Sequence, residues 1–250
     1  MVEIAALAFV SVFIGGMTKG ITGFGYAVTG TALLASFMPA KSAIILMLPA
    51  LIATNTVIAR QKGLKELLNR IKEFSFFAAS LVVGSIAGTL MINLLPQTVI
   101  IKAVAVLILG YIAFKQEFID IKFADQFRDF CLQKAHTYQE VLGFGSGVIF
   151  GAANVGVPIV AISDRIEDTH EEFMALLSGL MIIAISSRFV TSYSIGMYQM
   201  ESIVLSLFLI VPGMTGLKLG KQTREHLEKN SIEKLVLILL TAISLKLLIS

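Results

Sequence analysis

The chain has 250 residues, of which 56% are hydrophobic and only 15% are charged, and its mean hydropathy is +0.85. Soluble domains average about 25% charged residues, so this composition argues against a soluble fold and indicates a membrane protein. The single cysteine, Cys131, excludes an intramolecular disulfide, and no histidine cluster has the spacing of a metal site, so neither a metal nor a cofactor is expected.

Apolar runs of helical length follow one another along the chain. A membrane-crossing helix needs about 20 mostly apolar residues, because lipid offers no partner to its backbone polar groups. The runs are continuously apolar, as in residues 103–109, so α-helices are expected rather than a β-barrel. In the first half they cover residues 3–18, 22–38, 41–60, 74–94 and 97–115, and in the second half 138–153, 156–163, 172–193, 198–218 and 231–249.

The second half of the chain repeats the glycine pattern of the first. The pattern at residues 16–25 returns at residues 147–156, at an offset of 131 residues. Two glycines four residues apart, followed by a lysine, occur at residues 84–102 and again at 216–234. The sequence therefore predicts two repeats joined by a linker, at residues 1–117, 118–135 and 136–250.

The distribution of lysine and arginine predicts the topology, because these residues are retained on the cytoplasmic side. Basic clusters lie at 60–72, 115–134 and 218–229, and connections without lysine or arginine lie at 94–97 and 193–199. The basic cluster 115–134 is inside, and the helix 172–193 ends outside, so that helix must begin inside. The stretch 138–163 between them therefore enters and returns on the same side, which predicts a re-entrant or broken helix hairpin. The stretch 3–38 is its counterpart in the first repeat. Three crossings per repeat make the repeats inverted and place both termini outside.

Three transmembrane helices are predicted after each hairpin: 41–60, 74–94 and 97–115 in the first repeat, and 172–193, 198–218 and 231–249 in the second. Residues 61–73 and the linker 118–135 are amphipathic, which predicts cytoplasmic interfacial helices. The alternative for both is an ordinary polar loop packed on the protein. The fold class is thus an all-α polytopic membrane protein, expected in the inner membrane of a prokaryotic cell.

Inverted repeats with broken helices that meet near the midplane are typical of transporters. A helix N-terminus at a hairpin tip exposes backbone N–H groups and a partial positive charge, so two facing tips predict a site for a small anion. Glycines at the tips allow the backbone to approach a ligand closely. The predicted substrate-binding residues are Lys19, Thr22, Gly23, Phe24, Gly25, Tyr26, Asn55, Asn154, Val155, Gly156, Ser186, Ser187 and Arg188.

Some of these residues have a second interpretation. Lys19 and Arg188 are ionisable residues inside apolar runs, which mark transport pathways, but each also lies near enough to a predicted helix end to reach the headgroups. Close helix packing, and not ligand binding, is the favoured role of four further glycines: Gly16, Gly20, Gly147 and Gly151.

The tip motifs resemble those of a known family. Gly20-xx-Gly23-Phe24-Gly25 follows an apolar helix, and the second half carries Gly147-xxx-Gly151-xx-Asn154-Val155-Gly156-Val157-Pro158. Together they resemble the TauE/SafE family of sulfite exporters and related anion transporters, over nearly the whole chain. The resemblance implies transport of sulfite, thiosulfate, sulfoacetate or a similar anion. The family often has a glycine where this chain has Tyr26, and Asn154 stands where the first copy has Gly23.

The resulting hypothesis is a transporter that holds one anion between backbone N–H groups of both tips and works by alternating access. An inside-negative potential drives an anion outward, and the apolar runs hold no central carboxylate for proton coupling, so export or uniport is favoured over proton symport. An anion channel and a transporter of a non-sulfur carboxylate stay open as alternatives. No paired nucleophile and base is visible, so an enzyme is not expected. The expected partners are the small anion and the lipid bilayer, without nucleic acid; a homodimer stays open.

Overall fold

The structure is a computed structural model, and it describes residues 2–23, 25–115, 139–156, 170–224 and 229–249. Within these ranges every regular element is a helix. Five helical stretches of the described chain are long and apolar enough to cross a membrane: 3–22, 40–59, 75–94, 174–194 and 200–224. The protein is therefore an all-α, multi-pass membrane protein.

The helices of the first half are α1 (Val2–Thr22), α2 (Tyr26–Ala35), α3 (Ala40–Leu46), α4 (Leu48–Ala59), the 3₁₀ turn η1 (Arg60–Lys62), α5 (Leu64–Glu73), α6 (Ser75–Leu94) and α7 (Gln97–Lys115). Those of the second half are α9 (Gln139–Ala153), α11 (His170–Ser194), α12 (Met200–Phe208), α13 (Ile210–Arg224) and α14 (Lys229–Ile249). The linker 118–135 and the returning arm of the second hairpin after residue 156 lie outside the described residues.

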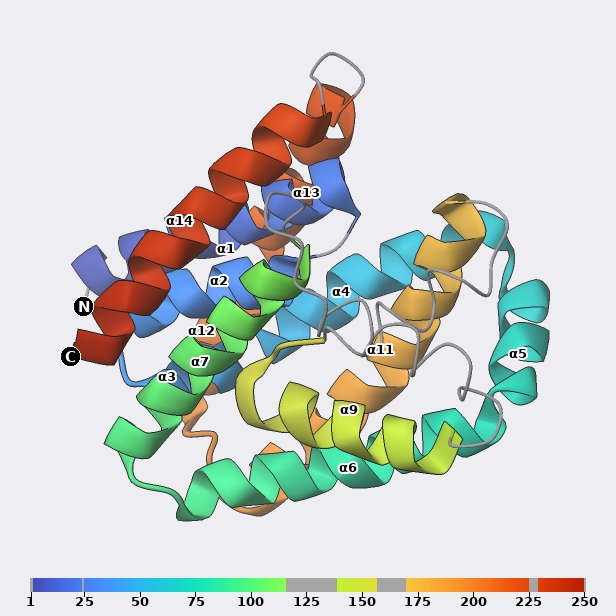
Figure 1. Cartoon of the computed structure of the whole chain (residues 1–250), viewed down its shortest axis with the longest axis horizontal. Helices are drawn as coiled ribbons and strands as arrows, with labels where there is room; N and C mark the ends of the chain where they lie inside the picture. Colours follow the sequence, from blue (N-terminus) through green and yellow to red (C-terminus); the bar gives the residue numbers. More distant parts are fainter. Residues whose placement is uncertain (1, 24, 116–138, 157–169, 225–228, 250) are drawn as a thin grey trace.

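Two pairs of helices, each with one helix from either half of the chain, pack so closely that their backbones are in contact. Helix α1 packs along α13, and α6 packs along α9 (Figure 1). A methyl group added at Gly16 or Gly20 would overlap the backbone of α13, and one added at Gly147 or Gly151 would overlap the backbone of α6. The packing role expected for these four glycines is therefore confirmed.

Helices α4 and α11 cross at the centre of the molecule, between the two glycine-packed pairs (Figure 1). On the outer side of α11, α5 is an amphipathic helix whose Leu67 and Ile71 lie over Gly179. Leu68, on the same short helix, is half-exposed. Residues 64–73 thus form a helix that packs on the protein through one face.

Two predicted transmembrane helices are broken near a proline. The stretch 40–59 is interrupted at Met47, just before Pro49, and the stretch 200–224 is interrupted at Leu209, just before Pro212. Proline has no N–H for the carbonyl four residues earlier, which for Pro49 is that of Ile45.

The Tyr198 hydroxyl donates a hydrogen bond to the Ile45 carbonyl oxygen, in place of the N–H that Pro49 lacks. Burial raises the pKa of the Tyr198 phenol, so the hydroxyl keeps the proton that this bond requires. A residue of the second half thus completes the backbone hydrogen bonding at the break between α3 and α4.

The two arms of the first hairpin differ in length. Helix α1 has 21 residues, which gives it a length of about 31 Å, enough to cross the hydrocarbon core. Helix α2 has only 10 residues, so its length is about 15 Å, or half the thickness of the hydrocarbon core. The residues on either side of the turn, Thr22 and Tyr26, are buried, so the start of α2 lies inside the protein.

We expect Gly147→Ala to lower the melting temperature in detergent by about 3–10 °C, because the new methyl group has no room beside α6. Gly145→Ala is the matched control on the same helix, since a methyl group there meets nothing within 4 Å. Alanine is the better helix former, so this control should be neutral or slightly stabilising. Equal losses in both variants would contradict the packing role.

Candidate functional site

A pocket lies where the end of α1, the start of α2, and helices α4, α9 and α11 meet. It holds about 530 Å³ of space between atoms, its open mouth included. Its polar lining residues are Lys19, Asn55, Asn154 and Ser178, and glycines of both tips, Gly23, Gly25 and Gly156, reach it too. Its apolar wall includes Val28, Leu51, Phe150, Leu177, Met181 and Ile185. The two tips predicted from sequence therefore line one cavity.

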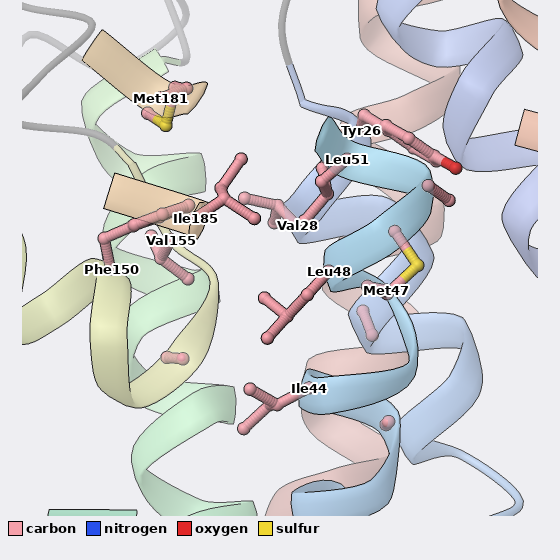
Figure 2. Close-up of a cluster of buried hydrophobic side chains, with 14 of the residues drawn as sticks. Tyr26, Val28, Ile44, Met47, Leu48, Leu51, Phe150, Val155, Met181 and Ile185 are labelled. Atoms are coloured by element: carbon pink, nitrogen blue, oxygen red, sulfur yellow. The ribbon is translucent and has the colours of Figure 1, made fainter. Parts of the chain in front are cut away.

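Figure 2 shows how the apolar side chains of the two halves face each other beside the pocket. Val28 of α2 and Leu51 of α4 lie opposite Phe150 of α9 and Ile185 of α11. This wall excludes water from one side of the pocket and strengthens any electrostatic contact made inside it.

The first tip presents the N-terminus of α2 to the pocket. Gly23 and Gly25 have φ of 90° and 87°, which a side chain at either position would strain, and they turn the chain from α1 into α2. Gly25 caps α2 without any side-chain hydrogen bond, and residues 25–28 line the pocket. The first N–H groups of a helix have no intrahelical partner, so this end of α2 offers bare donors and a partial positive charge.

Lys19 brings a basic side chain to the same tip. Its side chain is only 6% exposed, and its ammonium donates a hydrogen bond of 2.6 Å to the amide oxygen of Asn55. The Asn55 amide nitrogen donates to the Leu51 carbonyl at 2.8 Å, which fixes the orientation of the amide. An ammonium has three N–H bonds, so Asn55 holds Lys19 in the pocket wall and leaves donors for a ligand.

The second tip differs from the first in its side chains. At both tips the backbone N–H at the end of the first arm is occupied, since Gly23 donates to the Lys19 carbonyl at 2.8 Å. Asn154 follows the end of α9 with φ of 59°, and its N–H bonds to the Phe150 carbonyl at 2.9 Å. Its side-chain amide donates to the Thr31 hydroxyl at 2.8 Å and to the Ile44 carbonyl at 3.1 Å. The part of the hypothesis in which the anion binds the N–H groups of Gly23 and Asn154 is therefore wrong, and the free donors of the first tip lie at the start of α2.

Arg188 holds the second tip in place, and it does not itself line the pocket. Its side chain is fully buried, and its guanidinium donates to the Asn154 amide oxygen, to the Gly151 carbonyl at 2.9 Å and to the Thr89 hydroxyl at 3.3 Å. It also lies 4.9 Å from the centre of the Phe150 ring. A cation at the last carbonyls of α9 complements the helix dipole, so Arg188 caps this helix and positions Asn154.

With this geometry in place, the comparisons with known proteins identify the family. The family model for the sulfite exporter TauE/SafE matches residues 7–247. The chain belongs to the TauE/SafE sulfite exporter family. No curated protein and no solved structure matches it. The family is one of membrane transporters, and the match covers both tips and every helix that lines the pocket.

The structure places four further residues of the predicted substrate site, Thr22, Val155, Ser186 and Ser187, outside the pocket lining. Thr22 donates to the Thr18 carbonyl at 2.9 Å, and Ser187 donates to the Ala184 carbonyl at 2.8 Å. Ser186 is half-buried beside Ser187. Val155 is buried in the apolar cluster of Figure 2, and Phe24 lies outside the described residues.

Sequence reasoning missed Ser178, Thr31 and Thr89. Ser178 shares a helix face with Met181 and Ile185 at helical spacing, so the pattern of α11 could have indicated it. Thr31 and Thr89 reach the site only through the packing of α2 and α6 against the second half, and no local pattern marks them.

We expect Arg188→Lys to lower the melting temperature by about 5–10 °C and to weaken anion binding, because a lysine cannot contact Asn154, Gly151 and Thr89 together. The matched control is Arg70→Lys, since Arg70 pairs with Glu73 at 3.1 Å on an exposed helix face. Thermal unfolding of both variants in detergent checks the prediction. An unchanged Arg188→Lys protein would contradict the role of the guanidinium at the second tip.

Proposed function

We propose that this protein exports a small sulfur oxyanion or organosulfonate, of the class of sulfite, thiosulfate and sulfoacetate, from a site between its two hairpin tips. The observation that carries the proposal is the pocket in which Lys19, the uncapped start of α2, Asn55 and Asn154 converge. A buried cation beside free helix N–H groups recognises negative charge. Membership of a sulfite exporter family supports sulfur oxyanions among the possible anions.

In the proposed complex the residues of the pocket have separate tasks. The N–H groups at residues 26–28 bind the oxygens of the anion, and the Lys19 ammonium balances its charge. Asn55 keeps Lys19 directed into the pocket, and Asn154 closes the opposite side with its amide held by Arg188. The apolar wall gives room to an organic group next to the charged end.

Alternating access is the proposed mechanism, with the two repeats inverted in a prokaryotic inner membrane and both termini outside. The way in which helices of one half pack on helices of the other half supports this proposal. Helix α1 packs on α13 as α9 packs on α6, and in the repeat α1 corresponds to α9 and α6 to α13. A pair of repeats related by a two-fold axis in the membrane plane makes both contacts at once.

The proposed transport is driven by the membrane potential. Moving one charge through 100 mV is worth about 2.3 kcal/mol, and an inside-negative potential pushes an anion outward. Among the described residues that line the pocket, none is a carboxylate that would carry a coupled proton. Export without a proton gradient is therefore the simplest mode for this site.

We expect Lys19→Met to weaken the binding of thiosulfate by about tenfold to hundredfold, because it removes the buried charge from the pocket. Lys102→Met is the matched control, since Lys102 is an exposed residue of α7 and should leave the dissociation constant unchanged. Isothermal titration calorimetry on the purified proteins measures both. Wild-type affinity in Lys19→Met would overturn the site, and size-exclusion chromatography verifies that each variant is folded.

In liposomes, an imposed inside-negative potential should accelerate sulfite efflux, and a pH gradient at zero potential should not be required. The measurement compares sulfite release with potassium–valinomycin potentials and with pH jumps. Efflux that strictly needs the pH gradient would contradict uniport and favour proton coupling. Saturable counterflow supports a carrier, whereas a continuous single-channel current would favour a channel.

A further inference from the structure

The hydroxyl of Ser178, in the pocket wall, makes no hydrogen bond within the part of the chain that the structure describes. Ser178 belongs to α11 and is 1% exposed. Serine and threonine in helices usually donate to the carbonyl four residues earlier, as Thr54 and Thr191 do here at 3.0 Å and 2.9 Å. Ser178 does not make this bond, so its donor is free on a face of α11 that lines the pocket.

Ser178 differs from the other buried hydroxyls without a partner in the described chain. Thr29, Ser146, Ser192 and Ser244 do not line the pocket. Tyr26 does line it, but its hydroxyl lies against Gly213 and points away from Ile185 in Figure 2. Leaving a buried donor unpaired is costly, and among these hydroxyls of the described chain that of Ser178 is the one that a ligand in the pocket can pair.

We propose that the Ser178 hydroxyl donates a hydrogen bond to an oxygen of the anion bound at the start of α2, and so determines both affinity and the preference for oxygen-bearing anions. This inference rests on the proposed function. Helix α2 belongs to the first half of the chain and α11 to the second, so the anion is held by both halves at once. A hydroxyl donates well to an oxyanion oxygen and poorly to a group without lone pairs directed at it.

The experiment compares Ser178→Ala with Ser192→Ala, a matched control on the same helix. Ser192 is also fully buried with an unpartnered hydroxyl, but it does not line the pocket. Isothermal titration calorimetry of the purified full chain uses thiosulfate and sulfoacetate as probes. Ser178→Ala should raise both dissociation constants about tenfold to hundredfold, and Ser192→Ala should leave them within about twofold.

A second readout separates binding from a merely structural role. Without ligand, Ser178→Ala should melt at or above the wild-type temperature, because the hydroxyl makes no bond that the fold would lose. The stabilisation on adding thiosulfate should shrink, because ligand stabilisation depends on affinity. Ser178→Cys keeps the shape of the side chain but replaces the hydroxyl with a weaker and slightly larger thiol donor, so it should repeat the loss if the alanine variant does not fold.

The outcomes are distinguishable. Wild-type dissociation constants in Ser178→Ala, with clear binding by the wild type, would overturn the role of Ser178 and leave the anion site standing. A loss of ligand-free stability with unchanged affinity would make Ser178 structural. A wild-type protein that binds neither thiosulfate, sulfite nor sulfoacetate would overturn the proposed function, and the inference with it.

Discussion

Every backbone polar group inside a membrane protein needs a partner from the protein itself, and the two hairpin tips are where this need is hardest to meet. The second tip meets it with side chains: Arg188 caps the end of α9, and the Asn154 amide joins that end to α2 and α3. The first tip leaves the start of α2 uncapped, beside Lys19. The proposed anion site depends on this difference, because the donors that the fold leaves unpaired are the ones that a ligand can occupy.

Each half of the chain pairs one cation with one amide, but with the positions exchanged. In the first half the cation, Lys19, is on the hairpin and the amide, Asn55, is on the helix that follows. In the second half the amide, Asn154, is at the hairpin tip and the cation, Arg188, is on the following helix. Only the first arrangement puts the cation into the pocket lining.

Local patterns in the sequence were enough to predict the apolar helices, the glycine contacts and the tip residues Lys19 and Asn154. The spacing of glycines and the presence of a charge in an apolar run are local signals, and they can be recognised without knowing which helices pack together. Whether a side chain faces the pocket depends on helix rotation and on what packs in front of it. That is why Arg188 was expected to contact the substrate but lies behind Phe150 and Asn154, and why Ser178 was not found.

The glycine contacts between α1 and α13, and between α6 and α9, determine which parts of the molecule can move. Where two backbones are in direct contact, no side chain lies between them that could change its rotamer, so each helix pair is expected to move as one rigid unit. Where α4 and α11 cross, flexible side chains such as Leu51 and Met181 line the gap instead. In the proposed alternating access, the hinge would therefore lie between α4 and α11, and the two glycine-packed pairs would tilt about the proposed binding site.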